Sequence, residues 1–354
     1  MAVRRVCRFG IVVAVLTAMP ILSAPSHACA CGAAIAPGGA DATMNHEVAL
    51  VHWDGATETM VMQLAMDATT DHVALVVPTP TPATVAAADK ATFTELEQLT
   101  APQIRHQRHW TLGGNTRAPL EGARPGAASG APNVVNQVHL GPLEATTLAG
   151  GDLTGLQNWL SDNGYAIKAA VLQAMSPYVR DGWSFVAMRL TSTAPIVGGL
   201  DPVRLTFGSP TLVYPMRLSV AAPDPQHVTV FTLADHRQQR TDADKATQTT
   251  TVGFAGNIAA AVHDPLLREL AANHGSYLTK AQMDIARTSS ITSDFTFGNA
   301  ANDDPYRQVI VVNDDVVFPL ELVLAGFALT VIVVAVVLLA VLRRNRRRRS
   351  VALR

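Results

Sequence analysis

Cysteine is scarce in this chain, and that scarcity excludes one class of fold. Only three of the 354 residues are cysteines, whereas small disulfide-stapled domains need several pairs. Aromatic residues make up 5% of the chain and charged residues 16%, while 48% of the residues are hydrophobic. Because disordered chains are polar and highly charged, this composition predicts a folded protein.

Familiar catalytic and nucleotide-binding motifs are also missing. The sequence contains no Gly-x-Ser-x-Gly elbow, Ser-x-x-Lys pair, P-loop or dinucleotide-binding glycine motif. His46-Glu47 does not continue as a zincin motif, because Leu50 stands where the second histidine is needed. These absences disfavour an ATP-using or acyl-transferring enzyme of a familiar type, and no cofactor is predicted. A hydrolase with an unrecognised site stays open, because catalytic triads are defined by geometry and not by spacing.

The first residues have the three parts of a secretory signal peptide. Arg4, Arg5 and Arg8 precede an apolar run at residues 9–19, and the small residues 26–28 come directly before Cys29. This order predicts a signal peptide over residues 1–28. The apolar run is too short to span a bilayer. Acylation of Cys29 is the alternative, but Ser26 occupies the position where a lipoprotein needs a leucine-like residue.

A second apolar segment lies near the other end. Residues 322–342 contain no charge, and a run of arginines follows them directly. About 20 apolar residues are enough to cross the hydrocarbon core of a bilayer. We therefore expect a single transmembrane helix at residues 320–342 and a cytoplasmic tail at residues 343–354, because basic residues mark the inner side of a membrane. The residues that set this orientation are Arg343, Arg344, Arg346, Arg347, Arg348 and Arg349.

The net charge of −1 is the sum of two unlike parts. Ten of the 27 basic residues lie in the leader and the tail, whereas 27 of the 28 acidic residues lie within residues 29–319. Residues 29–319 therefore carry a net charge of −10, which makes nucleic acid an unsuitable partner. The predicted location is the cell membrane, with the N-terminal domain outside and the bilayer itself as one partner.

The exported part is predicted to be an α+β, strand-rich domain of antiparallel meanders with a few short helices. It occupies residues 29–319, either as one unit or as two sub-lobes at residues 29–110 and 133–300. Residues 111–132 are rich in glycine and proline and lack hydrophobic periodicity, so we expect a loop there. The acidic stretch at residues 300–319 is expected to be a solvated stalk.

Several local patterns predict individual elements. Asp54-Gly55 between apolar runs at residues 47–53 and 57–66 predicts a hairpin, and residues 72–77 are expected to complete a three-stranded meander. Thr92 and Glu95 predict a capping box for a helix at residues 93–99. A helix over residues 169–175 is expected to stop at Pro177. Two further helices are predicted near residues 265–273 and 279–287.

The two cysteines left after signal removal, Cys29 and Cys31, are two positions apart. A bond between them would close a small strained ring, and strained disulfides are labile and oxidising. This spacing therefore permits a thiol redox protein. The simpler interpretation is a disulfide that anchors the N-terminus, since thiol-exchange enzymes usually carry Cys-x-x-Cys at a helix start.

Two sets of residues could in principle hold a metal. Met60, Met62 and Met66, together with the cysteines, carry the soft ligands that Cu(I) prefers. Methionines that alternate along a strand also simply fill a core, and this interpretation is preferred. His106 and His109 lie beside Trp110, but no third ligand can be assigned to them. No metal site is therefore predicted, and these residues remain candidates only.

A set of short segments distributed along the exported region resembles a known bacterial family, domain of unknown function 2330. The segments are Cys31-Gly32, Trp53-Asp54-Gly55 with residues 59–64, Ala74-Leu75-Val76-Val77-Pro78-Thr79-Pro80, residues 159–165, residues 185–190, residues 202–207 and Tyr277-Leu278-Thr279-Lys280. The resemblance implies an exported protein, often with a C-terminal membrane helix. It implies no activity, cofactor or catalytic residue.

We therefore expect a non-enzymatic binding or scaffold module of the bacterial cell envelope, whose partner is an envelope protein or a cell-wall component. One alternative is an exported enzyme, either a hydrolase or a Cys29/Cys31 redox protein. Another is an accessory subunit of a membrane complex, since the 12 tail residues are too few for a signalling domain. No catalytic residue can be assigned from the sequence.

Overall fold

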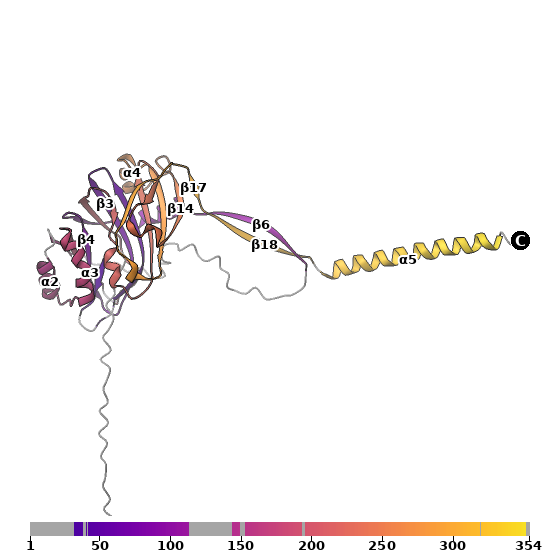
Figure 1. Cartoon of the computed structure of the whole chain (residues 1–354), viewed down its shortest axis with the longest axis horizontal. Coiled ribbons are helices and arrows are strands. Elements are labelled where there is room, and N and C mark those ends of the chain that lie inside the picture. The colour runs from indigo at the N-terminus through magenta and orange to yellow at the C-terminus, as the bar shows by residue number, and fades with distance from the viewer. Residues whose placement is uncertain are drawn as a thin grey trace, which may run out of the picture.

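The computed structural model describes residues 32–37, 40, 42–112, 144–148, 153–192, 195–318 and 320–351. A strand-rich head is joined by a narrow two-stranded stalk to one long helix at the far end (Figure 1). The predicted signal peptide, Cys29 and Cys31 lie outside the described residues, as does most of the predicted loop at residues 111–132.

The head is built on two large antiparallel sheets and one small sheet. The first has nine strands in the order β17 (Tyr306–Arg307), β14 (Thr249–Asn257), β15 (Tyr277–Ile285), β12 (Gln226–Ala234), β2 (Ala42–Trp53), β3 (Thr57–Ala68), β10 (Val203–Gly208) and β5 (Thr84–Ala87), with β9 (Val197–Gly199) paired to β3. Only the β12–β2 pair within it is parallel. The second sheet has the order β1 (Ala33–Ile35), β4 (His72–Thr79), β8 (Ser184–Thr191) and β7 (Glu144–Leu148). The small sheet is β11 (Leu212–Tyr214), β16 (Phe295–Asn299) and β13 (Gln238–Arg240).

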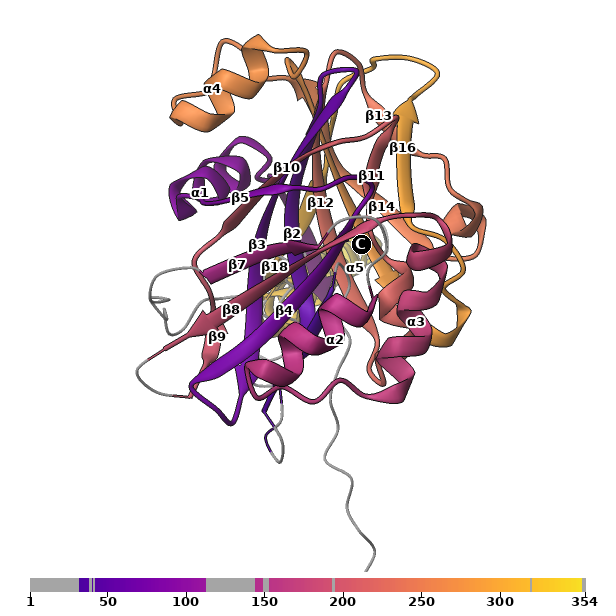
Figure 2. The same ribbon diagram turned by 90° about the vertical axis from the view of Figure 1, so that its left-hand side faces the viewer.

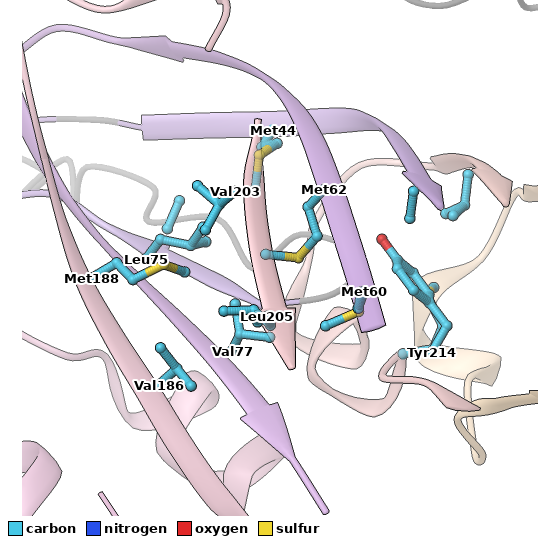
Figure 3. Close-up of a cluster of buried hydrophobic side chains, with 14 of the residues drawn as sticks. Met44, Met60, Met62, Leu75, Val77, Val186, Met188, Val203, Leu205 and Tyr214 are labelled. Carbon is cyan, nitrogen blue, oxygen red and sulfur yellow. The ribbon is translucent and has the colours of Figure 1, made fainter. Parts of the chain in front are cut away.

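The main core lies between the two large sheets. Met60 and Met62 from β3 and Leu205 from β10 meet Leu75 from β4 and Met188 from β8, and all five side chains are fully buried (Figure 3). The alternating methionines of β3 therefore point toward the opposing sheet, because successive side chains of a strand point to opposite faces.

Helices cover the outer faces of the two sheets, so the head has four layers. α2 (Leu153–Asp162) and α3 (Ala169–Arg180) pack on the far side of the four-stranded sheet (Figure 2). α1 (Lys90–Leu99) and α4 (Pro265–Ala272) pack on the far side of the nine-stranded sheet. Each large sheet is therefore buried on both faces, and the strand-rich α+β class predicted from the sequence is confirmed.

The hairpin at Asp54-Gly55 is confirmed, but the expected meander is wrong in its third strand. β2 and β3 pair antiparallel around this turn, where Gly55 has a φ of 101°. β4 does not join them and instead lies between β1 and β8. Val73 and Leu75 of β4 face the main core while Ala74 and Val76 face the helices. A strand that is apolar on both faces suits the centre of a covered sheet.

The helix predicted at residues 93–99 begins three residues earlier, and its cap is different. α1 starts at Lys90, and the side chain of Asp89 accepts a hydrogen bond from the Ala91 N–H. Glu95 accepts hydrogen bonds from the backbone N–H groups of His263 and Asp264. The expected capping-box glutamate therefore joins α1 to the start of α4.

Two other helix predictions also differ from the structure. α3 continues through Pro177 to Arg180, since Tyr178 is fully buried and holds the last turn against the head. Residues 279–287 form most of β15 instead of a helix, because β15 pairs with β12 on one side and β14 on the other. Tertiary pairing commonly overrides local preference in this way. The helix predicted near residues 265–273 is confirmed as α4.

The stalk is a two-stranded parallel ribbon of β6 (Gln103–Leu112) and β18 (Val309–Phe318). Its ten residue pairs give a length of roughly 33 Å. α5 (Leu320–Val351) follows β18, and its segment Glu321–Asn345 is long and apolar enough to cross a membrane (Figure 1). None of its most apolar window is buried against the rest of the described chain.

Strands from the two ranges proposed as sub-lobes share sheets in the structure. β4, within residues 29–110, pairs with β8, within residues 133–300. In the nine-stranded sheet, β2 comes from the first range and β12 from the second, and the two strands pair with each other.

Candidate functional site

A cavity of about 380 Å³ opens where α3 and the start of β8 meet the small sheet. This volume falls at the lower end of the range for small-molecule sites, roughly 300–1,000 Å³. Charged, hydroxyl and aromatic side chains share the lining, which combines segments from many parts of the chain. The lining residues are Pro80, Asp181, Trp183, Ser209, Pro210, Thr211, Val213, Arg217, Asp242, Thr292, Ser293, Asp294 and Thr296.

Arg217, the first residue of η1 (Arg217–Ala221), is held in one orientation at the wall of this cavity. Its Nε donates to Asp294 Oδ2 at 2.8 Å, and its Nη1 donates to Asp181 Oδ2 at 2.6 Å. The guanidinium carbon lies 4.2 Å from the ring centre of Tyr178 and 5.5 Å from that of Trp183. Two carboxylates and two aromatic rings thus fix the guanidinium plane.

Asp294 joins three parts of the head behind that guanidinium. Its Oδ1 accepts from the Tyr178 hydroxyl at 2.5 Å and from the backbone N–H groups of Met216 and Arg217 at 2.7 and 3.0 Å. Burial, and then the Asp294 charge, raise the pKa of Tyr178 well above its ordinary value. Burial acts to lower the pKa of Arg217, but the Asp294 and Asp181 carboxylates outweigh it and the net shift is upward. Both groups therefore keep their protons.

A second buried ion pair stands directly behind the cavity floor. Arg240 donates through Nε and Nη2 to both oxygens of Asp242, at 2.9 and 2.6 Å. Asp244 accepts from the Thr292 N–H, the Thr292 hydroxyl and the Ser293 N–H. Burial acts to raise the pKa of Asp244, but these hydrogen bonds outweigh it and lower the pKa. The loop that carries Thr292 and Asp294 is therefore fixed on both sides.

A few polar groups at the cavity are left without a partner among the residues that the structure describes. The Nη2 of Arg217 and the indole N–H of Trp183 are such donors, and Asp181 uses only one of its two oxygens. The Thr211 side chain, half-buried at the rim, makes no hydrogen bond. These groups can bind a polar ligand without disturbing the ion pairs that shape the cavity.

Glu58 lies fully buried next to this region, beneath β11. One of its oxygens accepts from the backbone N–H of Val213, which lines the cavity, at 3.0 Å. The other oxygen, Oε1, has no partner among the described residues. Burial raises the pKa of Glu58 well above its ordinary value, and the Val213 N–H opposes this only in part. Burial at this position therefore favours the protonated form of Glu58.

Two smaller cavities lie close by. One, of about 300 Å³, is lined by residues that include Trp53, Asp54 and His274. The Nδ1 of His274 lies 2.8 Å from Asp235 Oδ2. The other, of about 330 Å³, contains Arg237, which donates to the backbone carbonyl of Asp304. The indole N–H of Trp53 is already used, since it donates to the Ser209 carbonyl at 2.9 Å.

The methionines proposed as soft metal ligands lie apart from all three cavity linings. Met60, Met62 and Met66 are at most 1% exposed and belong to the main core. His106 lies on the stalk and contacts Asp314 at 3.2 Å, whereas the side chain of His109 is outside the described part. In the described part of the chain, no group of three or more His, Cys, Asp or Glu side chains could hold a metal ion. The six tail arginines all fall within the range of α5.

The cavity residues were not identified from the sequence. No pattern in the sequence points to Asp181, Trp183, Arg217 or Asp294 as residues of a site. These residues are up to 113 positions apart, and no local motif connects them. The available signals were weak: tryptophan occurs only four times in the chain, and Trp183 directly follows Asp181-Gly182.

Comparison with solved structures gives weak matches, among them two structures of a baculovirus protein. The crystal structure of baculovirus P35 matches with a TM-score of 0.33 and 9% identity, over 76% of this chain and 97% of that one. A mutated baculovirus P35 after caspase cleavage matches with a TM-score of 0.28 and 8% identity, over 74% and 99%. Likeness at this level supports no conclusion about this chain. No curated protein matches it.

A family model gives a clearer result. It is described as an uncharacterized protein conserved in bacteria (DUF2330), and it matches residues 25–298. The match covers most of the head, including every residue of the cavity lining. The chain therefore belongs to the uncharacterised bacterial family DUF2330.

Proposed function

We propose that this chain is a membrane-tethered binding protein of the bacterial envelope, with its head outside the membrane and no catalytic activity of its own. The observation that carries the proposal is the stalk. β6 and β18 connect the head to α5, so the head and its cavity are held roughly 33 Å beyond the end of that helix (Figure 1). Such a spacer suits a module that reaches a partner away from the bilayer.

The chemistry of the cavity favours binding over catalysis. The carboxylate oxygens of Asp242 and Asp294 already accept hydrogen bonds from the side chains of Arg240 and Arg217 and from backbone N–H groups. A general acid or base needs a group that is free to give a proton to the substrate or to take one from it. Of the carboxylates in the lining, only Asp181 has an oxygen free, and it is half-exposed. A rigid recognition surface is the use that this arrangement supports best.

The predicted orientation follows from the two ends of the sequence. A signal peptide at residues 1–28 would export the head, and the arginine cluster after the apolar segment would stay inside. Without residues 343–354 the helix would lose its topology signal but keep the uncharged segment at residues 322–342.

Cysteine labelling in intact cells tests this orientation. In a variant without the native cysteines, Lys90→Cys places a thiol on the exposed start of α1, and Ser350→Cys places one in the tail. A membrane-impermeant maleimide is expected to label position 90 in intact cells and position 350 only after lysis. Labelling of position 350 in intact cells would overturn the proposal.

Site-specific photo-crosslinking tests the binding role. A photoreactive residue at Thr211, on the cavity rim, is expected to yield a defined crosslinked product in growing cells. The same residue at Lys90 serves as control, because α1 lies on the opposite side of the head. Equal crosslinking at the two positions, or none at Thr211, would contradict a binding role for the cavity.

A further inference from the structure

We propose that the cavity between α3 and the small sheet binds a neutral, hydroxyl-rich sugar ring, such as one unit of an envelope glycan. This inference rests on the proposed binding function and names the chemical class of its ligand. Three properties of the lining support it: its charge balance, its apolar surfaces and its free hydrogen-bonding groups.

Charge balance disfavours an anionic ligand. Arg217 is the only cationic residue in the lining, and it already contacts the carboxylates of Asp294 and Asp181 at 2.8 and 2.6 Å. Arg240 lies behind the lining and is matched to Asp242 at 2.6 Å. The two arginines thus face three carboxylates, and a phosphate or carboxylate ligand would meet net negative charge. A neutral ligand meets no such repulsion.

The apolar part of the lining suits the C–H face of a pyranose. Trp183 is half-buried and lines the cavity together with Pro80 and Pro210. An indole ring offers a large rigid surface with one polar edge. Sugars combine an apolar ring face with a rim of hydroxyls, so a flat aromatic side chain beside polar groups matches both.

The free polar groups match the hydroxyl rim. Each sugar hydroxyl is both a donor and an acceptor. Arg217 Nη2 and the Trp183 indole N–H can donate to it, and the free oxygen of Asp181 can accept from it. Because hydrogen bonds and ring stacking already fix Arg217, little side-chain entropy is lost when a ligand binds there.

The neighbouring cavity provides a contrast within the same molecule. Trp53 lines it, but its indole N–H donates to the Ser209 carbonyl and is therefore committed to the fold. Trp183 has no such partner among the residues that the structure describes. Trp53 and Trp183 are thus matched tryptophans, one structural and one available to a ligand.

Calorimetric titration of the full chain in lipid nanodiscs tests the inference. The probes are short neutral oligosaccharides of glucose, mannose, galactose, arabinose and N-acetylglucosamine. At least one is expected to bind with a Kd of about 10 mM or lower, the range of weak sites. Trp183→Phe, which removes the free N–H, is expected to weaken that binding at least about tenfold. Trp159→Phe, on α2 and outside the cavity lining, is expected to leave it unchanged.

A second variant guards against an effect of misfolding. Thr211→Trp fills the cavity from its rim and leaves both ion pairs in place, so it is expected to abolish binding while the melting temperature of the head stays unchanged. The matching uronic acids and sugar phosphates are expected to bind more weakly than the neutral sugars.

Three results would overturn the inference: no binding of any neutral probe, binding that survives both Trp183→Phe and Thr211→Trp, or tighter binding of the anionic analogues. The proposed function has a separate readout. If crosslinking at Thr211 in cells persists while no sugar binds, the chain is a binding protein whose ligand belongs to another class.

Discussion

The head and the stalk each contain a basic side chain in contact with a carboxylate from a distant segment, and the two pairs differ in how much water reaches them. Arg217 meets Asp294 in the head at 2.8 Å, with side chains 17% and 7% exposed. His106 meets Asp314 across the stalk at 3.2 Å, with side chains 64% and 50% exposed. Exposed pairs contribute little to stability, whereas loss of one partner from a buried pair is costly. The two pairs have similar distances and should behave very differently.

The head and the stalk as whole regions also differ in how far their strands are covered by other elements. In the head, each large sheet is covered on both faces, and the ion pairs sit within hydrogen-bond networks. In the stalk, two strands pair only with each other in the described part, and Ile104 and Val311 are about half exposed. A two-stranded sheet is marginally stable by itself. We therefore expect the head to unfold cooperatively. Single substitutions in the stalk are expected to change the free energy of unfolding of the chain only a little.

The largest effect is expected from Asp294→Ala in the head. The change removes the carboxylate that accepts hydrogen bonds from Tyr178, Met216 and Arg217. It also leaves the largely buried guanidinium of Arg217 with one carboxylate partner in place of two. The free energy of unfolding should fall by about 3–5 kcal/mol. Urea unfolding of the full chain in micelles, followed by tryptophan fluorescence, measures it. Asp314→Ala in the stalk is the matched control, and an equal effect of the two changes would remove the contrast.

A somewhat smaller loss is expected from Met62→Ala in the main core. Met62 is fully buried between the two large sheets (Figure 3). Truncation of such a side chain leaves a cavity and typically costs about 2–5 kcal/mol. The same urea experiment applies. Val311→Ala on the exposed stalk is the control and should change stability by less than about 0.5 kcal/mol.

Glu58→Gln is expected to change how the stability of the head depends on pH. Burial raises the folded pKa of Glu58 above its ordinary value of 4.5, so the folded state favours the protonated acid. The contribution of Glu58 is then fully present below that value and is lost as the pH rises through the raised pKa. Glutamine cannot ionise, so the variant should gain stability relative to the parent chain as the pH increases.

Urea unfolding at a series of pH values measures this difference. Glu269→Gln, at an exposed position on α4, is the control and should follow the parent chain at every pH. A difference between Glu58→Gln and the parent chain that stays constant with pH would show that the pKa of Glu58 does not rise on folding as described.

The smallest effect is expected from His106→Ala in the stalk. The exposed pair with Asp314 should contribute less than about 1 kcal/mol, and salt should screen it further. Hydrogen exchange of β6 amides, compared with those of β12 in the head, reports it locally. A large loss of protection throughout β6 would mean that the pair, and not the backbone ladder, holds the ribbon together.

Local patterns in the sequence predicted those elements whose causes are local. The hairpin at Asp54-Gly55 and the helix begun by Asp264-Pro265 both depend on a few neighbouring residues. The 21 uncharged residues at 322–342 likewise predicted a spanning helix, and α5 contains them.

The errors occurred where distant segments decide the outcome. β4 was expected beside β3, yet its two apolar faces place it between β1 and β8. β15 was expected to be a helix, yet it fills a place between β12 and β14. β6 was not foreseen at all, because its pairing partner β18 lies about 200 residues further along the chain. No window of adjacent residues contains this information.

By itself, the sequence determined the strand-rich class, the family and a helix able to span a membrane, because composition, short motifs and one long apolar run carry these properties. The tertiary structure alone decided that Asp181, Trp183, Arg217 and Asp294 share one cavity. Their meeting depends on how α3, η1 and the small sheet pack together. The energy of that packing comes from burial summed over the whole head, which no local pattern records.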